Sequence, residues 1–290
     1  EGMIKCRHGS GTYLARELKD NRFSNHILFL NVARKDQFIP EFGVDRIRHY
    51  LAERGIGLRT LPVYEFGLDI IEAARDALGI LATGWLTEDF LKQVQGIRLP
   101  VLVVGNYRLN TKVPSVSLNI EGGAYRLTKT FIENGKKRPA LFCTVSEEYY
   151  SSLCYYAGYK RALEEYGLSE LILNMDSFLK NEPEFLAFMK AEKPDAILCY
   201  NALAGGSLYY EALRMGCRIP EDFSLVVIDK PGLEDLGGPQ IAYIDHPLEE
   251  MGYTGASRLI DQLESEREFE PFFQLFSPVF IEKETFCRRI

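Results

Sequence analysis

Two apolar segments of the chain each end in a polar residue that could bind a ligand. Ala196–Tyr200 is followed by Asn201, and Leu225–Ile228 is followed by Asp229. The stretch between them, Leu203–Met215, has the length and apolar spacing of a helix. Because ligands of parallel sheets sit just outside the carboxyl ends of strands, Asn201 and Asp229 predict a site for a small polar molecule. The structural alternatives are a helix cap for Asn201 and a turn role for Asp229.

Other chemistries lack the residue spacing that they require. No two of the four histidines share a helical-turn spacing, and the six cysteines form no CxxC pair. We therefore expect neither a metal site nor a disulfide framework. The glycine-rich run 55–60 precedes an apolar segment instead of following one, so it fails as a dinucleotide motif. With no Gly-x-Ser-x-Gly elbow and no P-loop, we expect no cofactor and no enzymatic activity.

The composition is that of an ordinary soluble globular protein. Of the 290 residues, 46% are hydrophobic and 26% are charged. A chain of this length suffices for one two-lobed unit or for two domains. The net charge of -7 argues against non-specific DNA binding by the bulk of the chain. No apolar run approaches the ~18 residues of a membrane span, and no signal-peptide pattern is visible, so we expect a cytoplasmic location and no membrane partner.

Short apolar runs alternate with amphipathic segments after Ser24, which indicates an α/β fold with parallel sheets. The strands that we expect are 27–32, 58–63, 78–83, 101–104, 115–118, 140–143, 196–200, 225–228 and 279–282. The helices that we expect include one over 44–51, one over 124–132, and the segments 155–166, 182–191, 203–215 and 248–263.

Three polar segments interrupt this pattern, at 133–139, 237–240 and 265–271. They predict two smaller sheets with a chain that crosses between them several times. One sheet of nine or ten strands is the alternative. The first twenty residues differ, because 3–6 and 12–14 flank a turn with two glycines and predict a β-hairpin. A hairpin alone is marginally stable, so it is expected to belong to a domain outside this chain.

The N-terminal hairpin segment and the rest of the chain each resemble a known family. The segment EGMIKCRHGSGTYLA resembles the last hairpin of the winged helix-turn-helix domain of GntR-type regulators. The chain from His26 onward resembles the effector-binding core of the LacI/GalR repressor family, itself similar to periplasmic sugar-binding proteins. The stretches that carry this second resemblance are 119–123, 157–163, 194–197, 219–229 and 251–252. The combination is that of arabinose-repressor-like regulators.

The resemblance implies two doubly wound parallel-sheet lobes joined by three crossovers, the periplasmic-binding-protein-like type I fold. Residues 1–20 would be the end of the wing and a linker, and 21–290 the effector-binding domain. Lobe one would span about 24–136 and 248–266, and lobe two about 138–244 and 272–290.

The function implied is that of a homodimeric transcription regulator, a repressor, with a small polar effector between its lobes. The effector would be a sugar or a sugar derivative. Operator DNA would be bound by the head to which the hairpin belongs, with Arg7, His8 and Gly9 at the wing tip. The alternative is a transport-type sugar-binding protein with the same core.

The resemblance also implies roles for residues beyond the two strand ends. Asp229 and Asn201 match family positions that bind sugar hydroxyls. Glu121 stands where the family often has Asp, and His246 where it often has Gln. Tyr155 stands where the family usually has an Arg that binds the ring oxygens of the sugar.

Four further residues complete the expected site. Asn106 follows the strand 101–104, where the family frequently has Asp-Arg. Arg34 could supply the missing guanidinium. Trp85 and Phe42 could stack on the apolar face of a sugar, with ordinary packing as the alternative.

Overall fold

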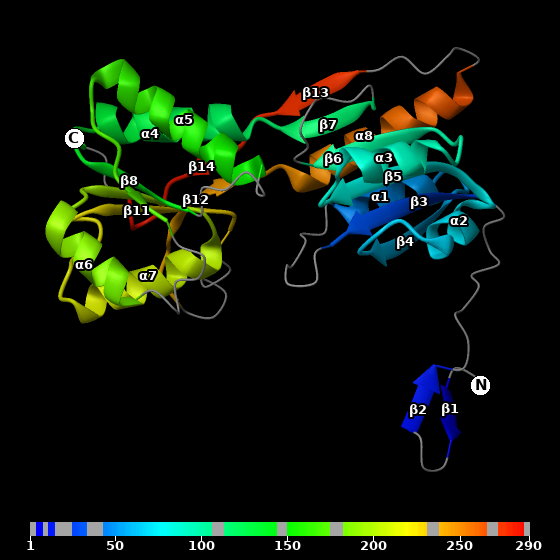
Figure 1. The fold of residues 1–290 in the computed structure, drawn as a ribbon, viewed down its shortest axis with the longest axis horizontal. Helices are drawn as coiled ribbons and strands as arrows, with labels where there is room; N and C mark the ends of the chain where they lie inside the picture. The colour runs from blue at the N-terminus through cyan, green and yellow to red at the C-terminus, as the bar shows by residue number, and fades with distance from the viewer. Residues whose placement is uncertain are drawn as a thin grey trace. The chain divides into compact units, whose positions relative to one another are not determined.

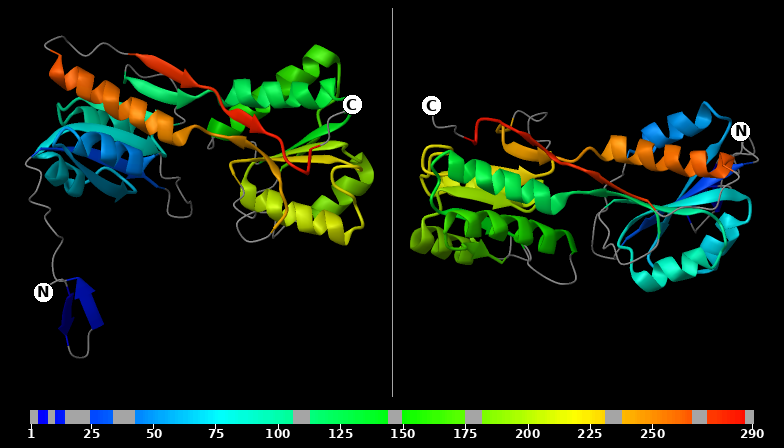
Figure 2. Two further views of the ribbon diagram at one scale, coloured as in Figure 1. Left: turned by 180° about the vertical axis from the view of Figure 1, so that it is seen from behind. Right: turned by 90° about the horizontal axis from the view of Figure 1, so that it is seen from above.

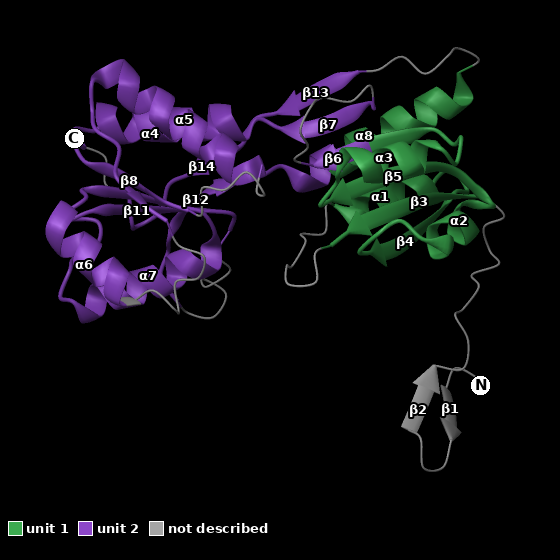
Figure 3. Cartoon of the chain, viewed as in Figure 1, with its two compact units in different colours: residues 1–102, 252–270 green, residues 103–251, 271–290 purple. Residues whose placement is uncertain are grey.

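The computed structural model describes residues 25–33, 43–105, 113–143, 150–174, 182–230, 238–265 and 272–286, together with the backbone of 4–7 and 11–14. Contacts within the chain divide it into two compact units (Figure 3). Unit 1 comprises Glu1–Leu102 and Gly252–Glu270, and unit 2 comprises Val103–Met251 and Pro271–Ile290. The lobe boundaries expected from the resemblance stay a prediction.

The first six-stranded sheet has the order β13-β7-β6-β5-β3-β4 (Figure 1). Its strands are β3 His26–Val32, β4 Gly57–Val63, β5 Ala77–Gly84, β6 Val101–Gly105, β7 Ser115–Leu118 and β13 Phe273–Phe276. The helices near it are α1 Val44–Ala52, α2 Leu68–Ala74, α3 Glu88–Gln95 and α8 Leu248–Glu264. The apolar run 27–30 of β3 is fully buried, as strands covered on both faces require. A Cβ at Gly79 would lie 3.2 Å from Leu259, so α8 packs closely on β5.

The second six-stranded sheet has the order β14-β12-β11-β10-β8-β9. Its strands are β8 Pro139–Phe142, β9 Ile172–Leu173, β10 Ala196–Cys199, β11 Ser224–Ile228, β12 Ala242–Asp245 and β14 Val279–Ile281. Only β14 among these pairs antiparallel, against β12. Helices α4 Ile120–Glu133 and α5 Tyr150–Tyr166 cover one face, and α6 Glu182–Glu192 and α7 Ala202–Arg214 cover the other (Figures 1 and 2).

The chain passes between the two sheets three times, which confirms the predicted two-sheet α/β fold. The passages lie between β7 and α4, between β12 and α8, and between β13 and β14. None of the three polar segments marks a passage. Segment 133–139 leads from α4 to β8 and segment 237–240 precedes β12, both within the second sheet's own run of elements, and segment 265–271 leads from α8 to β13 within the first. The passages are instead short: Asn119, residues 246–247 and residues 277–278. Polar composition marks surface exposure, which any loop has, and not a change of sheet.

The predicted strands and helices are all present, most with ends shifted by one to three residues. Elements α2, α3, β9, β12 and β13 were not among those predicted. Strand β9 has only two residues, and β13 alternates exposed and half-buried side chains, so neither is a continuous apolar run.

The N-terminal hairpin is present as predicted. Strands β1 Ile4–Arg7 and β2 Gly11–Leu14 pair antiparallel, with Ile4 opposite Leu14 and Arg7 opposite Gly11. Its assignment to a winged domain stays a prediction, and His8 and Gly9 lie outside the described residues. Helices long and apolar enough to span a membrane are absent from the part of the chain that the structure describes.

Candidate functional site

Three neighbouring strands of the second sheet end in polar residues at one edge. In the parallel pairing of β10, β11 and β12, Cys199 lies opposite Val227, and Ile228 lies opposite Ile244. Asn201, Asp229 and His246, which follow these strands, therefore lie at the same carboxyl edge. This is the edge at which parallel sheets bind ligands.

Asp229 has an unusual backbone conformation at this edge. Its φ of 69° lies in the left-handed region, which Asp tolerates better than most residues do. The Asp229 N–H donates to the carbonyl of Ile244 at 3.1 Å, which holds the turn against the end of β12. The Asp229 side chain is 48% exposed. A carboxylate held in this way can accept further hydrogen bonds from a ligand.

A chain of contacts joins Tyr155, His246 and Asp229. The His246 Nδ1 lies 2.6 Å from the Asp229 Oδ1, and the His246 side chain is only 8% exposed. The His246 Nε2 lies 3.1 Å from the hydroxyl of Tyr155, a buried residue of α5. We call these three residues the Tyr-His-Asp relay. The sequence predicted each of them, and the structure brings the three together.

The proton of the Tyr155 hydroxyl is held by burial and charge. Burial, and next to it the charge of Asp229, raise the pKa of Tyr155 well above its usual range. Tyr155 therefore keeps its proton and can donate it to the His246 Nε2. The other ring nitrogen of His246, Nδ1, faces the carboxylate of Asp229.

Asn201 acts as the N-cap of α7. Its Oδ1 accepts a hydrogen bond from the Ala204 N–H at 2.7 Å, so the structural alternative is confirmed. The cap uses the side-chain oxygen and leaves the amide nitrogen as a donor for other partners. Ligand binding by Asn201 stays a prediction.

Glu121 has a partner that the sequence analysis missed. It lies in the first turn of α4, and its Oε1 lies 2.6 Å from the Arg161 Nη1 of α5. Both side chains are about half exposed. The pair joins α4 to α5, which gives Glu121 a structural role whether or not it also binds a ligand. Arg161 lies within the stretch 157–163 that carried the family resemblance, and this was the available signal.

Trp85 follows β5 at the carboxyl edge of the first sheet. Its N–H donates to the carbonyl of Val32 at 2.7 Å, so its backbone bridges the ends of β5 and β3. A stacking role for its partly buried side chain stays a prediction. Arg34, Phe42 and Asn106 lie outside the described residues, and of Arg7 only the backbone is described.

Two buried polar side-chain oxygens near the same edge of the first sheet were not predicted. Asn31 of β3 lies opposite Thr83 of β5, and the side-chain oxygens Oδ1 and Oγ1 of this pair are buried without a hydrogen-bond partner. An unpaired buried polar group costs about 1–3 kcal/mol, so these two oxygens call for a water or ligand partner. Polar residues late in otherwise apolar strands were the sequence signal.

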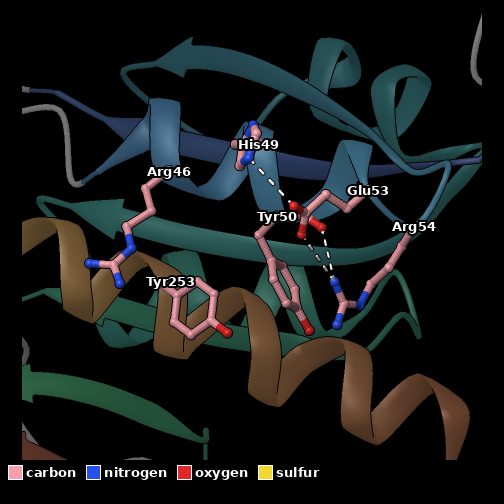
Figure 4. Close-up of a pocket in the computed structure, with 6 residues that line it drawn as sticks. All are labelled: Arg46, His49, Tyr50, Glu53, Arg54 and Tyr253. Carbon is pink, nitrogen blue, oxygen red and sulfur yellow. Dashed lines mark hydrogen bonds and ion pairs between the residues drawn. The ribbon is translucent and has the colours of Figure 1, made fainter.

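A groove on unit 1 is formed by residues of two helices, and not by the ends of strands as the candidate site is (Figure 4). It has a volume of about 170 Å³ and contains none of the residues predicted to bind the effector. The rings of Tyr50 and Tyr253 meet edge to face, with their centroids 5.0 Å apart. The guanidinium group of Arg54 lies over the Tyr50 ring, and that of Arg46 lies over the Tyr253 ring. The groove is lined by Arg46, His49, Tyr50, Glu53 and Arg54 around α1 and by Tyr253 of α8.

Comparison with models of protein families identifies the family of this chain. A model of the periplasmic binding protein-like domain matches residues 128–286, which is more than half of the chain. The chain belongs to this family.

Individual relatives agree with the family model. Catabolite control protein A of Staphylococcus aureus (strain MRSA252) is 26% identical over 66% of this chain and 59% of its own length. The HTH-type transcriptional repressor PurR of Vibrio vulnificus (strain CMCP6) is 25% identical over 90% of this chain and 81% of its own length. The chain thus spans about three fifths of the catabolite control protein that it matches.

Solved structures share the fold. A transcriptional regulator CelR–cellobiose complex has a TM-score of 0.74 at 22% identity, covering 91% of this chain and 85% of its own. The Escherichia coli transcriptional repressor ascG has a TM-score of 0.75 at 19% identity, covering 90% of this chain and 99% of its own. The predicted resemblance to the LacI/GalR core is confirmed, whereas the GntR-type wing stays a prediction.

Proposed function

We propose that this chain is the effector-sensing part of a cytoplasmic transcription repressor. A small polar effector, a sugar, binds at the carboxyl edge of the second sheet and alters the DNA affinity of an attached head domain. The observation that carries this proposal is the Tyr-His-Asp relay, which holds a half-exposed carboxylate at that edge.

The named relatives support this function over the alternative of a transport protein. The curated relatives are called a catabolite control protein and a transcriptional repressor. Two of the solved structures with this fold are described as regulators with a bound sugar, cellobiose in one and ribose in the other. A carboxylate that accepts hydroxyl hydrogen bonds suits ligands of this kind.

Asp229→Ala is expected to weaken effector binding about 10- to 100-fold, because one charge-assisted hydrogen bond contributes about 1.5–3 kcal/mol. A thermal-shift screen of mono- and disaccharides against the whole chain identifies the ligand, and calorimetry gives the Kd. A ligand at 100 times its Kd stabilises the native state by about 2.7 kcal/mol, which is easily measured.

Asp245→Ala is the matched control, because Asp245 is an exposed carboxylate at the end of the neighbouring strand β12. It should leave the Kd unchanged. Wild-type affinity in Asp229→Ala would place the site elsewhere, and a complete sugar library without any thermal shift would refute sugar sensing.

We further propose that the protein is a homodimer whose interface includes one face of α7. Operator half-sites require two heads, so a repressor of this type needs a second copy. Three apolar side chains of α7 are exposed: Leu203 at 80%, Tyr210 at 51% and Leu213 at 44%. Spacings of seven and three residues put them on one side of the helix.

The double variant Leu203→Glu/Tyr210→Glu is expected to be monomeric at micromolar concentration, since two desolvated carboxylates oppose association. Sedimentation velocity measures the change, and circular dichroism should show an unchanged fold because both residues are on the surface. Leu68→Glu on α2, where Leu68 is 76% exposed, is the control and should remain dimeric. A dimeric double variant, or dissociation caused by the control, would exclude the α7 interface.

A further inference from the structure

The groove that α1 and α8 form on unit 1 plays no part in the proposed function, and most of its lining side chains can donate hydrogen bonds. Glu53 is the single acid among the six lining residues. A groove with many donors and one acid favours a ligand that accepts hydrogen bonds and carries negative charge. The donors are the side chains of Arg46, His49, Tyr50, Arg54 and Tyr253.

The tyrosine rings hold the two guanidinium groups in place. The Arg54 Cζ lies 3.9 Å from the centroid of the Tyr50 ring, and the Arg46 Cζ lies 5.0 Å from the centroid of the Tyr253 ring. Figure 4 shows the two rings between the two guanidinium groups. A guanidinium group that stacks by its face keeps the N–H groups in its plane available to an oxyanion. The Arg54 Nη1 also donates to the Tyr50 carbonyl at 3.3 Å, which fixes this group beside the groove.

The hydroxyl of Tyr50 is a donor that the fold leaves unused. Tyr50 lines the groove although it is only 6% exposed. Within the described part of the chain, its hydroxyl has no hydrogen-bond partner. Figure 4 shows this hydroxyl beside the Arg54 guanidinium group. Because polar groups of buried side chains are nearly always paired, a ligand or a water is expected at this point of the groove.

Glu53 is the acid that faces these donors in the unliganded protein. Its Oε1 lies 3.5 Å from the His49 Nε2, and its Oε2 lies 4.0 Å from the Arg54 Nη1. Both distances are long for hydrogen bonds, and the Glu53 side chain is 60% exposed, so these contacts are weak. An oxyanion on a ligand can therefore displace the Glu53 carboxylate into solvent.

We propose that this groove is a second ligand site, which binds a small molecule through an oxyanion group, a phosphate or a carboxylate. The Arg54 N–H groups and the Tyr50 hydroxyl donate to the oxyanion, and Arg46 adds positive charge. The volume of about 170 Å³ is below that of a typical pocket for a drug-sized molecule, so the ligand is small. All lining residues belong to unit 1, whereas Asp229 and its relay belong to unit 2.

Ligand-observed NMR on the whole chain tests this site with glycerol 3-phosphate, inorganic phosphate and citrate as probes. Low ionic strength is required, because salt screens contacts of exposed charges. We expect saturable binding of at least one probe with a Kd of about 1 mM or lower, and none of neutral glycerol. Binding of the two phosphates alone would identify a phosphate ligand, and binding of citrate alone a carboxylate. Glycerol that binds as tightly as its phosphate, or no saturable binding of any probe up to about 10 mM, would overturn the proposal.

Arg54→Gln should weaken the binding of the probe about tenfold or more, because it removes a charge-assisted hydrogen bond. Arg48→Gln is the matched control. Arg48 is an exposed arginine of the same helix that pairs with Asp45 and does not line the groove. The control removes the same charge from the protein and should change the Kd by no more than about twofold. Equal weakening in both variants would mean that the probe responds to surface charge alone, and the site would be excluded.

Two further variants have opposite expected effects. Tyr50→Phe should weaken binding about two- to tenfold at an unchanged melting temperature, because it removes only a hydroxyl without a partner in the described structure. Glu53→Gln should tighten binding about threefold, because it removes the competing carboxylate. Weaker binding by Glu53→Gln would contradict the proposal. Asp229→Ala should leave the Kd of the probe unchanged, and a loss of binding there would place the probe at the effector edge instead.

Discussion

Gly158→Ala is expected to lower the free energy of unfolding by about 3 kcal/mol, although alanine is normally the better helix former. At an open helical position the same change stabilises by about 1 kcal/mol. Here a Cβ would collide with the carbonyl oxygen of Glu121 and would lie 2.8 Å from the Tyr125 nitrogen and 2.9 Å from the Ala124 Cβ. Two of these three atoms belong to the backbone of α4, so helix α5 must move away as a whole.

Urea denaturation followed by circular dichroism measures this effect. Ala157→Gly is the matched control, because Ala157 is the exposed neighbour on α5 and reports helix propensity alone. It should destabilise by only about 1 kcal/mol. A Gly158→Ala protein as stable as the wild type would mean that α4 and α5 are not packed as closely as described. Since Tyr155 lies one turn before Gly158, the variant should also weaken effector binding.

Gly205→Ala is expected to destabilise the protein by about 2–3 kcal/mol for a related reason. Gly205 is buried in α7, where a Cβ would collide with the Cγ1 of Val227 and lie 3.1 Å from its Cβ. Val227 belongs to β11, two residues before Asp229. Overpacking here therefore strains the strand end that carries the candidate site.

A second substitution can relieve this collision, because it involves a side chain and not the backbone. Val227→Ala removes the Cγ1. The double variant Gly205→Ala/Val227→Ala should therefore lose less stability than the sum of the losses in the two single variants. We expect a favourable coupling of about 1–2 kcal/mol, measured by a double-mutant cycle in urea. Strictly additive losses would contradict the proposed contact between α7 and β11.

Gly158 and Gly205 show how packing determines the positions of the residues at the candidate site. Neither touches a ligand in our proposal, yet each permits the close approach of a helix that carries or supports a relay residue. Periodicity in the sequence placed Gly158 and Gly205 in helices. It could not show what they face, because close approach depends on the neighbouring element.

The strand ends were the part of the site that local sequence could determine. Continuous apolar runs before Asn201 and Asp229 predicted buried parallel strands, and a buried parallel strand exposes its last residue at the carboxyl edge. The edge strands β9 and β13 were not predicted, because β9 has only two residues and β13 alternates exposed and half-buried side chains. Strand β12 was not predicted either, although Ala242, Tyr243 and Ile244 are apolar and buried. His246 was accordingly placed by resemblance to a family and not by the end of a predicted strand.

The sequence by itself determined the α/β class, the two-sheet organisation and the identity of the relay residues. Only the tertiary structure decided that Tyr155, Asp229 and His246 form one hydrogen-bonded chain and that Glu121 pairs with Arg161. Local patterns report burial and periodicity, which arise from neighbours in the chain. Contacts between residues 17 and 91 positions apart arise from the packing of strands and helices on one sheet, and no local pattern encodes that packing.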